Sequence, residues 1–109
     1  MTINEAIKAA VEPVIPICVP GVYGGNAKEY CTFNYSEHPD MFGNDWPMCM
    51  KYLVQIHYFC ETEKNPLNTK KQLRQALASS GFTYPSIIVA SDDDGQHFVF
   101  ECEYEDGDV

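Results

Sequence analysis

The chain has 109 residues, 45% of them hydrophobic and 13% aromatic, and its 16 acidic against 7 basic residues give a formal net charge of −9. A chain of this length and composition folds as one small globular domain and buries roughly 60 to 70% of its unfolded surface. The composition excludes intrinsic disorder and collagen-like structure. A strongly acidic chain also argues against specific binding of DNA or RNA, because that binding depends on clustered Lys and Arg.

The cysteines and the first residues indicate a reducing, cytosol-like compartment. Five cysteines, an odd number without a C-x-x-C pair, are typical of free thiols rather than of a disulfide framework. The first residues include Asn4, Glu5 and Lys8, so they lack the basic start and unbroken apolar core of a signal peptide. No apolar run approaches the roughly 20 residues that a membrane helix needs, and we expect no membrane association.

A capping box marks the first predicted helix. Thr2 is followed three residues later by Glu5, and these two side chains satisfy backbone donors at a helix start. Apolar residues then recur at three- and four-residue spacing until prolines end the pattern. The spacing predicts an amphipathic helix from Ile3 to about Glu12. A turn-rich connection with a short strand over residues 16–19 follows.

Two predicted strands come next, separated by a long predicted loop. Residues 29–37 are rich in aromatic and β-branched side chains, and residues 49–60 alternate along the clearest strand in the chain. Residues 38–48 contain two prolines and a glycine, which favour a loop. This loop nevertheless carries Phe42 and Trp46. Their rings either anchor a protein partner or fold back onto the sheet as a lid, and the sequence leaves both open.

The last third of the chain predicts a helix and a hairpin. Residues 69–80 show a core-facing apolar stripe, begin beside capping side chains and end at a glycine. Residues 86–91 and 96–104 flank an Asp94-Gly95 turn signal, which predicts a terminal β-hairpin. The acidic residues 105–109 are expected to fray.

The order of the predicted elements is α-β-β-α-β-β. Helices and hairpins are thus segregated, which is typical of an α+β fold. We expect a four-stranded antiparallel sheet with two helices packed on one face. No repeat or linker divides the chain, so residues 1–109 form a single domain.

The candidate chemical sites are weak. His57 and Cys60 are three residues apart on a predicted strand, so they point to opposite faces and cannot share a zinc ion. The acidic turn at residues 92–95 lacks the spaced ligands of a calcium loop. The chain has no signature of a cysteine enzyme and no phosphate-binding loop. We therefore predict no metal, no cofactor and no enzymatic activity.

A series of motifs resembles a known family over nearly the whole chain. The motifs are Y-G-G (23–25), E-Y-C-T-F-N-Y (29–35), F-G-N-D-W-P (42–47), V-Q-I-H-Y-F (54–59) and F-V-F-E-C (98–102). In this order, and after an amphipathic helix, they resemble the small tail terminator or tail completion proteins of long, non-contractile-tailed phages and prophages. These are also called tail-to-head joining proteins, and they offer no catalytic motif to carry over.

The resemblance implies a structural assembly protein of the virion tail. Such a protein forms a ring, typically a hexamer, on the end of the tail tube, stops tube growth and offers a surface to the head connector. Its partners are the tail tube protein, the head connector proteins and further copies of itself, and it can be a monomer until it assembles in the bacterial host cytoplasm. A hexamer would carry a formal charge of −54, so DNA passes through an acidic lumen without binding.

A head-to-tail ring needs two different contact patches on each subunit. For the first we predict the residues in and beside the long loop, namely Tyr35, Phe42, Asp45, Trp46 and Pro47. For the second we predict one edge of the sheet. The alternative function is a small acidic adaptor or inhibitor, which would bind a basic protein such as a nuclease through the carboxylates of the terminal hairpin.

Overall fold

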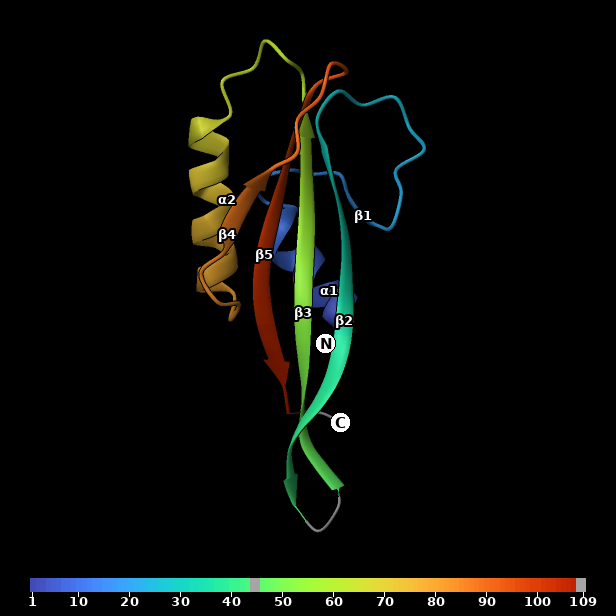
Figure 1. Ribbon diagram of the computed structural model, residues 1–109, viewed down its shortest axis with the longest axis vertical. Helices are drawn as coiled ribbons and strands as arrows, with labels where there is room; N and C mark the ends of the chain where they lie inside the picture. Colours follow the sequence, from blue (N-terminus) through green and yellow to red (C-terminus); the bar gives the residue numbers. More distant parts are fainter. Residues whose placement is uncertain (44–45, 108–109) are drawn as a thin grey trace.

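The computed structural model describes the backbone of residues 1–43 and 46–107 and, within these ranges, every side chain except those of Met41 and Phe42. It shows an α+β fold with two helices and a five-stranded sheet (Figure 1). The elements are α1 (Ile3–Val11), β1 (Cys18–Pro20), β2 (Tyr30–Gly43), β3 (Trp46–Cys60), α2 (Leu67–Ser79), β4 (Ser86–Val89) and β5 (Gln96–Asp106). Neither helix is long and apolar enough to cross a membrane, as far as the described residues go.

The sheet is mixed and has the order β1-β2-β3-β5-β4. The expected α+β class is confirmed and the four expected strands pair antiparallel, but a fifth strand makes the sheet mixed rather than wholly antiparallel. Strand β1 adds a fifth strand, parallel to β2, with Cys18 opposite Cys31, and the other three pairings are antiparallel. Prolines and glycines surround β1 and limit it to three residues. A strand this short has too little alternation of apolar and polar residues to reveal its partner in the sheet.

The predicted loop at residues 38–48 was also wrong, because β2 and β3 continue through most of it as one long hairpin. Pro39 lies opposite Met50 and Pro47 lies opposite Phe42. Each proline sits where its strand has no second neighbour, since β1 covers only the start of β2 and β5 reaches only to Met50 on β3. Proline is tolerated at such an edge because no ladder partner needs its missing N–H.

The capping box at the start of α1 is confirmed. The Thr2 hydroxyl accepts from the Glu5 amide at 3.2 Å, and the Glu5 carboxylate accepts from the Thr2 amide at 2.9 Å. This second bond lowers the pKa of Glu5. The helix ends at Val11 with Glu12 as its C-cap, close to the predicted end.

One hydrophobic core joins both helices to the sheet. Helix α1 lies behind the sheet in Figure 1, and alternate residues of β3 from Val54 to Cys60 are buried against the helices. Helix α2 contributes Leu73 and Leu77, which are fully buried. The alternating β3 residues in between, such as Gln55 and His57, line the opposite side of the sheet, which we call the open face.

The last part of the chain follows the prediction, with shifted boundaries. Helix α2 begins two residues earlier than expected, after Pro66, and Gly81 follows its C-cap with a φ of 92°. The turn between β4 and β5 is closed by backbone bonds between Asp92 and Gly95. Strand β5 extends to Asp106 rather than fraying after residue 104, because the long β3 offers pairing partners as far as Met50.

The loop before β2 is held by one tyrosine, and this leads to a testable prediction. The Tyr23 hydroxyl accepts from the Ala27 amide at 3.1 Å, and its ring lies 4.5 Å from the ring of Tyr30. A Cβ added at Gly25 would overlap the Tyr23 hydroxyl, whereas a Cβ at Gly24 would meet nothing.

We expect Gly25→Ala to displace the Tyr23 ring and to lower the free energy of unfolding by about 1 kcal/mol. Gly24→Ala is the matched control and should change stability by less than about 0.5 kcal/mol. Urea denaturation of both variants measures the difference. Equal stability of the two variants would contradict this role of Gly25.

Candidate interaction surfaces

The outer part of the β2–β3 hairpin projects beyond the rest of the sheet as a two-stranded arm. Strand β5 pairs with β3 only as far as Met50, and beyond it, among the described residues, β2 and β3 pair only with each other. We call residues 40–43 and 46–49 the arm. It lies at the lower end of Figure 1 and contributes to the elongated shape of 54 × 26 × 22 Å. A two-stranded hairpin is marginally stable on its own in water, so the arm gains stability from any surface that covers it.

The arm exposes two large apolar side chains. Trp46 is 72% and Met48 62% exposed. Because side chains alternate along a strand, both lie on the same side of β3 as the core residue Val54. They therefore extend the apolar side of the strand past the body of the protein, as a surface suited to a protein contact.

The structure brings together only part of the predicted contact set. Trp46 and Pro47 are neighbours on the arm, and the backbone of Phe42 pairs with Pro47; the side chain of Phe42 and the whole of Asp45 lie outside the described residues. Tyr35 lies elsewhere, with its half-buried side chain directed toward α1. Its hydroxyl donates to Asn4 Oδ1 at 2.6 Å, so it ties α1 to the sheet.

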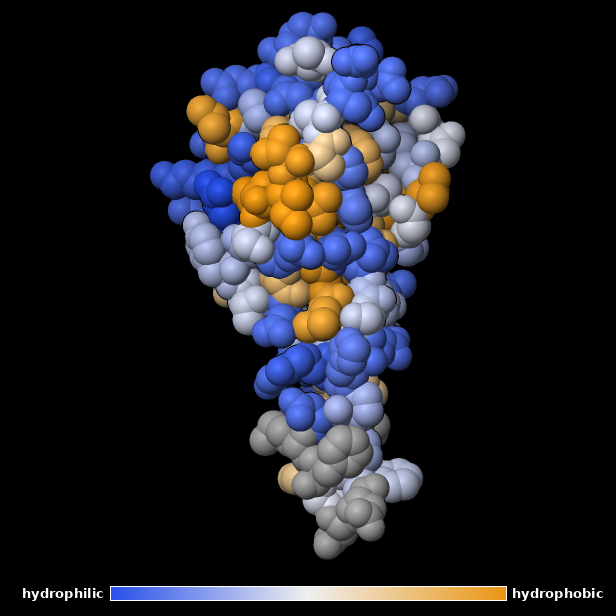
Figure 2. Space-filling model, in the orientation of Figure 1, coloured by the Kyte–Doolittle hydropathy of each residue, from blue (hydrophilic) through white to orange (hydrophobic). Residues whose placement is uncertain are grey.

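A second exposed apolar surface lies at the β4 edge of the sheet. Ile88 is 50% and Val89 66% exposed, and Val99, opposite Ile88 on β5, is buried. We call these three residues the β4 patch, and a broad hydrophobic area is visible there in the upper half of Figure 2. Strand β4 pairs only with β5 within the described ranges. It carries none of the charges or prolines that commonly protect an edge strand from pairing with other chains.

Five polar side chains form a chain of hydrogen bonds across the open face. Asn34 Nδ2 donates to Gln55 Oε1 at 3.1 Å, and Gln55 Nε2 donates to Glu101 Oε2 at 3.0 Å. Asn34 Oδ1 lies 2.9 Å from His57 Nε2, which must therefore be the donor. His57 Nδ1 is then free to accept from His97 Nε2 at 2.8 Å. All four bonds run in one direction, from His97 to Glu101, and we call this series the polar ladder.

The polar ladder fixes neutral histidines. Burial lowers the pKa of His57, and the neighbouring His97 lowers it further. Burial also lowers the pKa of His97, although Asp92 opposes that shift. A proton added at His57 Nδ1 would face the N–H of His97, so the bond between the two rings would then require His97 to change its tautomer.

This arrangement predicts a loss of stability in mild acid. Because folding lowers both pKa values, the unfolded chain binds more protons near pH 6, and stability rises with pH. The wild type should therefore lose unfolding free energy as the pH falls from 7 to 5, through the unfolded-state pKa of about 6.5. His57→Asn should lose less over the same interval. Urea denaturation at several pH values measures these slopes, with His38→Asn as the control expected to match the wild type.

The thiols offer no reactive or metal-binding centre. All five cysteines are free and buried, and burial raises the pKa of Cys18 and of Cys102 to about 12. Such thiols stay protonated and unreactive. His57 lies on the open face and Cys60 in the core, which confirms that the two side chains lie on opposite sides of the strand. No group of three His, Cys, Asp or Glu side chains suited to a metal occurs among the described residues.

The sequence predicted contact at one edge of the sheet without indicating which residues form it, and it gave no sign of the polar ladder. The β4 patch and the polar ladder both consist of residues that only the pairing of distant strands brings together. The alternation of side chains along the strand predicted the face on which His57 lies, but it could not predict which residue of β5 lies opposite which residue of β3. Comparison with family models and with curated protein sequences gave no match.

Proposed function

We propose that this protein is a structural assembly protein that forms a ring, with the arm of each subunit placed against the β4 patch of the next. The observation that carries the proposal is the presence of two different exposed apolar surfaces on one chain. A head-to-tail ring requires two such patches, because each subunit uses one surface toward each neighbour. Trp46 is the anchor on the arm, and Ile88, which lies beside Val99 on the open face, is the centre of the surface that receives it, with Val89 on the other side of the same edge strand.

The resemblance of the sequence motifs supports a more specific form of this proposal. In that form the protein is a tail terminator that caps the tail tube of a non-contractile-tailed phage or prophage. The ring, a hexamer, assembles on the tube protein in the host cytoplasm and then receives the head connector. An acidic subunit of charge −9 suits a lumen through which DNA passes, since like charges prevent DNA from binding.

Electron microscopy tests the terminator role directly. Tail tubes of the phage or prophage that encodes the chain are incubated with the purified protein and scored for ring-like density at one end. We expect capped ends with a defined number of subunits. Bare tubes would overturn the proposal, provided that circular dichroism shows a folded protein and that the tube ends are free.

One observation favours the alternative of an acidic adaptor for a basic protein. The β4–β5 turn presents Asp92, Asp93 and Asp94 on the surface. Exposed carboxylates of this kind accelerate association with a basic partner and make it dependent on salt. The adaptor would form a complex with one soluble protein, whereas the terminator binds a tube end with ring stoichiometry.

A further inference from the structure

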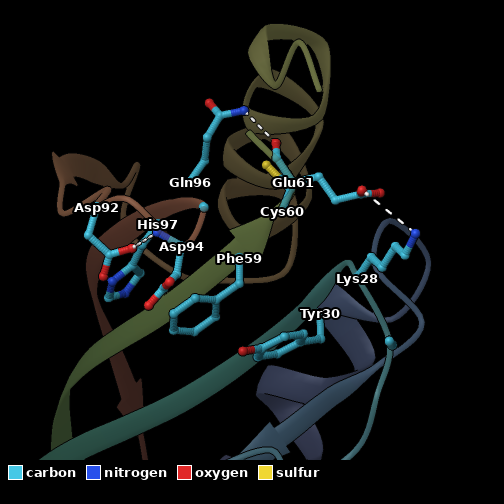
Figure 3. A pocket seen from close by; sticks show the side chains of 11 residues that line it. Lys28, Tyr30, Phe59, Cys60, Glu61, Asp92, Asp94, Gln96 and His97 are labelled. Carbon is cyan, nitrogen blue, oxygen red and sulfur yellow. Dashed lines mark hydrogen bonds and ion pairs between the residues drawn. The ribbon is translucent and has the colours of Figure 1, made fainter. Parts of the chain in front are cut away.

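A cavity of about 450 Å³ lies at the end of the sheet opposite the arm. It opens between the β4–β5 turn, the end of β3 and the segment that leads into β2 (Figure 3). Neither the arm nor the β4 patch lines it. A volume of this size accommodates one large side chain or a small ligand.

One wall of the cavity is a row of aromatic rings. Tyr30, Phe59 and His97 lie directly opposite one another on β2, β3 and β5. The ring centroids are 4.8 Å apart between Tyr30 and Phe59 and 4.2 Å apart between Phe59 and His97. All three side chains are only half-buried. The row therefore offers a preformed apolar wall along which an aliphatic or planar group can pack.

The rest of the cavity is acidic. Asp92 and Asp94 stand on the turn and Glu61 directly after the end of β3, against the single positive charge of Lys28. The Asp94 carboxylate has no hydrogen bond or ion pair within the part of the chain that the structure describes. Lys28 Nζ lies 3.9 Å from Glu61 in an exposed pair, and the Glu61 carboxylate points toward Lys28 and away from Asp94 (Figure 3).

We propose that this cavity binds the guanidinium group of an arginine side chain presented by a basic partner protein. The aliphatic stem packs along the aromatic row, and the planar head donates hydrogen bonds to the carboxylates of Asp92 and Asp94, which stand together on the β4–β5 turn (Figure 3). Arginine fits better than lysine because its donors spread over a planar fork, can meet two carboxylates at once and stack beside aromatic rings.

The occupant comes from another kind of protein rather than from a second copy of this chain. Arg74 is the only arginine in the sequence. It lies half-buried on α2 with its Nε atom buried, so a second copy could not insert the whole guanidinium group into the cavity without moving this side chain. The inference does not depend on ring formation, because the cavity is separate from both ring surfaces.

Nuclear magnetic resonance of the ¹⁵N-labelled protein tests the inference with small probes at low ionic strength. The probes are N-acetylarginine amide, its uncharged isostere N-acetylcitrulline amide, and N-acetyllysine amide with a free ε-ammonium. We expect saturable shifts at the backbone amides of Asp94, Gly95 and His97 with the arginine probe, weaker shifts with the lysine probe and none with the citrulline probe. Equal effects of arginine and citrulline, equal effects of arginine and lysine, or no saturable shift at all would overturn the proposal.

The neighbouring turn residue provides a matched control. Asp94→Asn should weaken binding of the arginine probe about fivefold, because it removes one charge-assisted hydrogen bond. Asp93→Asn removes the same charge from the same turn, but Asp93 does not line the cavity, so binding should be unchanged. Equal weakening by the two variants would show general attraction to an acidic turn and would also overturn the proposal.

Discussion

Trp46→Ala should leave a folded protein that no longer forms rings on tube ends. The side chain is 72% exposed, so its removal should change the free energy of unfolding by less than about 0.5 kcal/mol. A tryptophan that anchors an interface commonly contributes at least about 2 kcal/mol, which corresponds to about a 30-fold weaker contact between each pair of subunits. Ring density in electron micrographs should therefore disappear while the circular dichroism spectrum stays the same.

Val22→Ala is the matched control for this experiment. Val22 is also apolar and is 88% exposed, but it lies in the loop before β2, outside the arm and the β4 patch. We expect rings to form normally with this variant. Normal rings from Trp46→Ala would exclude the arm as the contact. If Trp46→Ala unfolds instead, Met48→Ala and Ile88→Ser test the same two surfaces independently.

Phe100→Ala should cause the largest loss of stability. Phe100 is fully buried at the centre of the sheet, opposite Ile56 on β3 and Ile87 on β4. Removing a buried phenylalanine ring costs about 3 to 5 kcal/mol, because the apolar contacts are lost and a cavity remains. A domain of this size has roughly 5 to 15 kcal/mol in total, so the variant should lose a large share of its stability and unfold at a much lower urea concentration than the wild type.

Phe59→Ala is the comparison for this second variant. Phe59 is on the neighbouring strand and has the same side chain, but it lies half-buried on the open face. We expect it to lose less than half as much unfolding free energy as Phe100→Ala, as measured by thermal and urea denaturation. Similar losses would show that the open face is packed as tightly as the core.

The local signals in the sequence predicted much of the fold. The capping box at Thr2 and Glu5 located the start of α1, and the alternation around Ile56 located the central strand. These signals depend on neighbours in the sequence, and therefore survive without any knowledge of the tertiary structure. The α+β class followed from the order of the elements alone.

The features that the sequence did not predict share one physical cause: each depends on where a strand lies within the sheet and which strands are its neighbours. Pro39 and Pro47 indicated a loop, but the structure places both on edges where proline does not interrupt a ladder. The partner of β1 is set by a parallel pairing with β2, which no local pattern reveals. The contact between His57 and His97 joins residues 40 positions apart, and thus depends on a register that only the assembled sheet defines.

The strand order also determines when the protein can fold during its synthesis. The last strand, β5, lies between β3 and β4 and supplies the core residues Phe98 and Phe100. A nascent chain that ends before β5 leaves β4 without a neighbour and one side of β3 unpaired. The ribosome must therefore release all residues through β5 before the sheet closes, and folding waits for contacts between distant residues, which are slow to form.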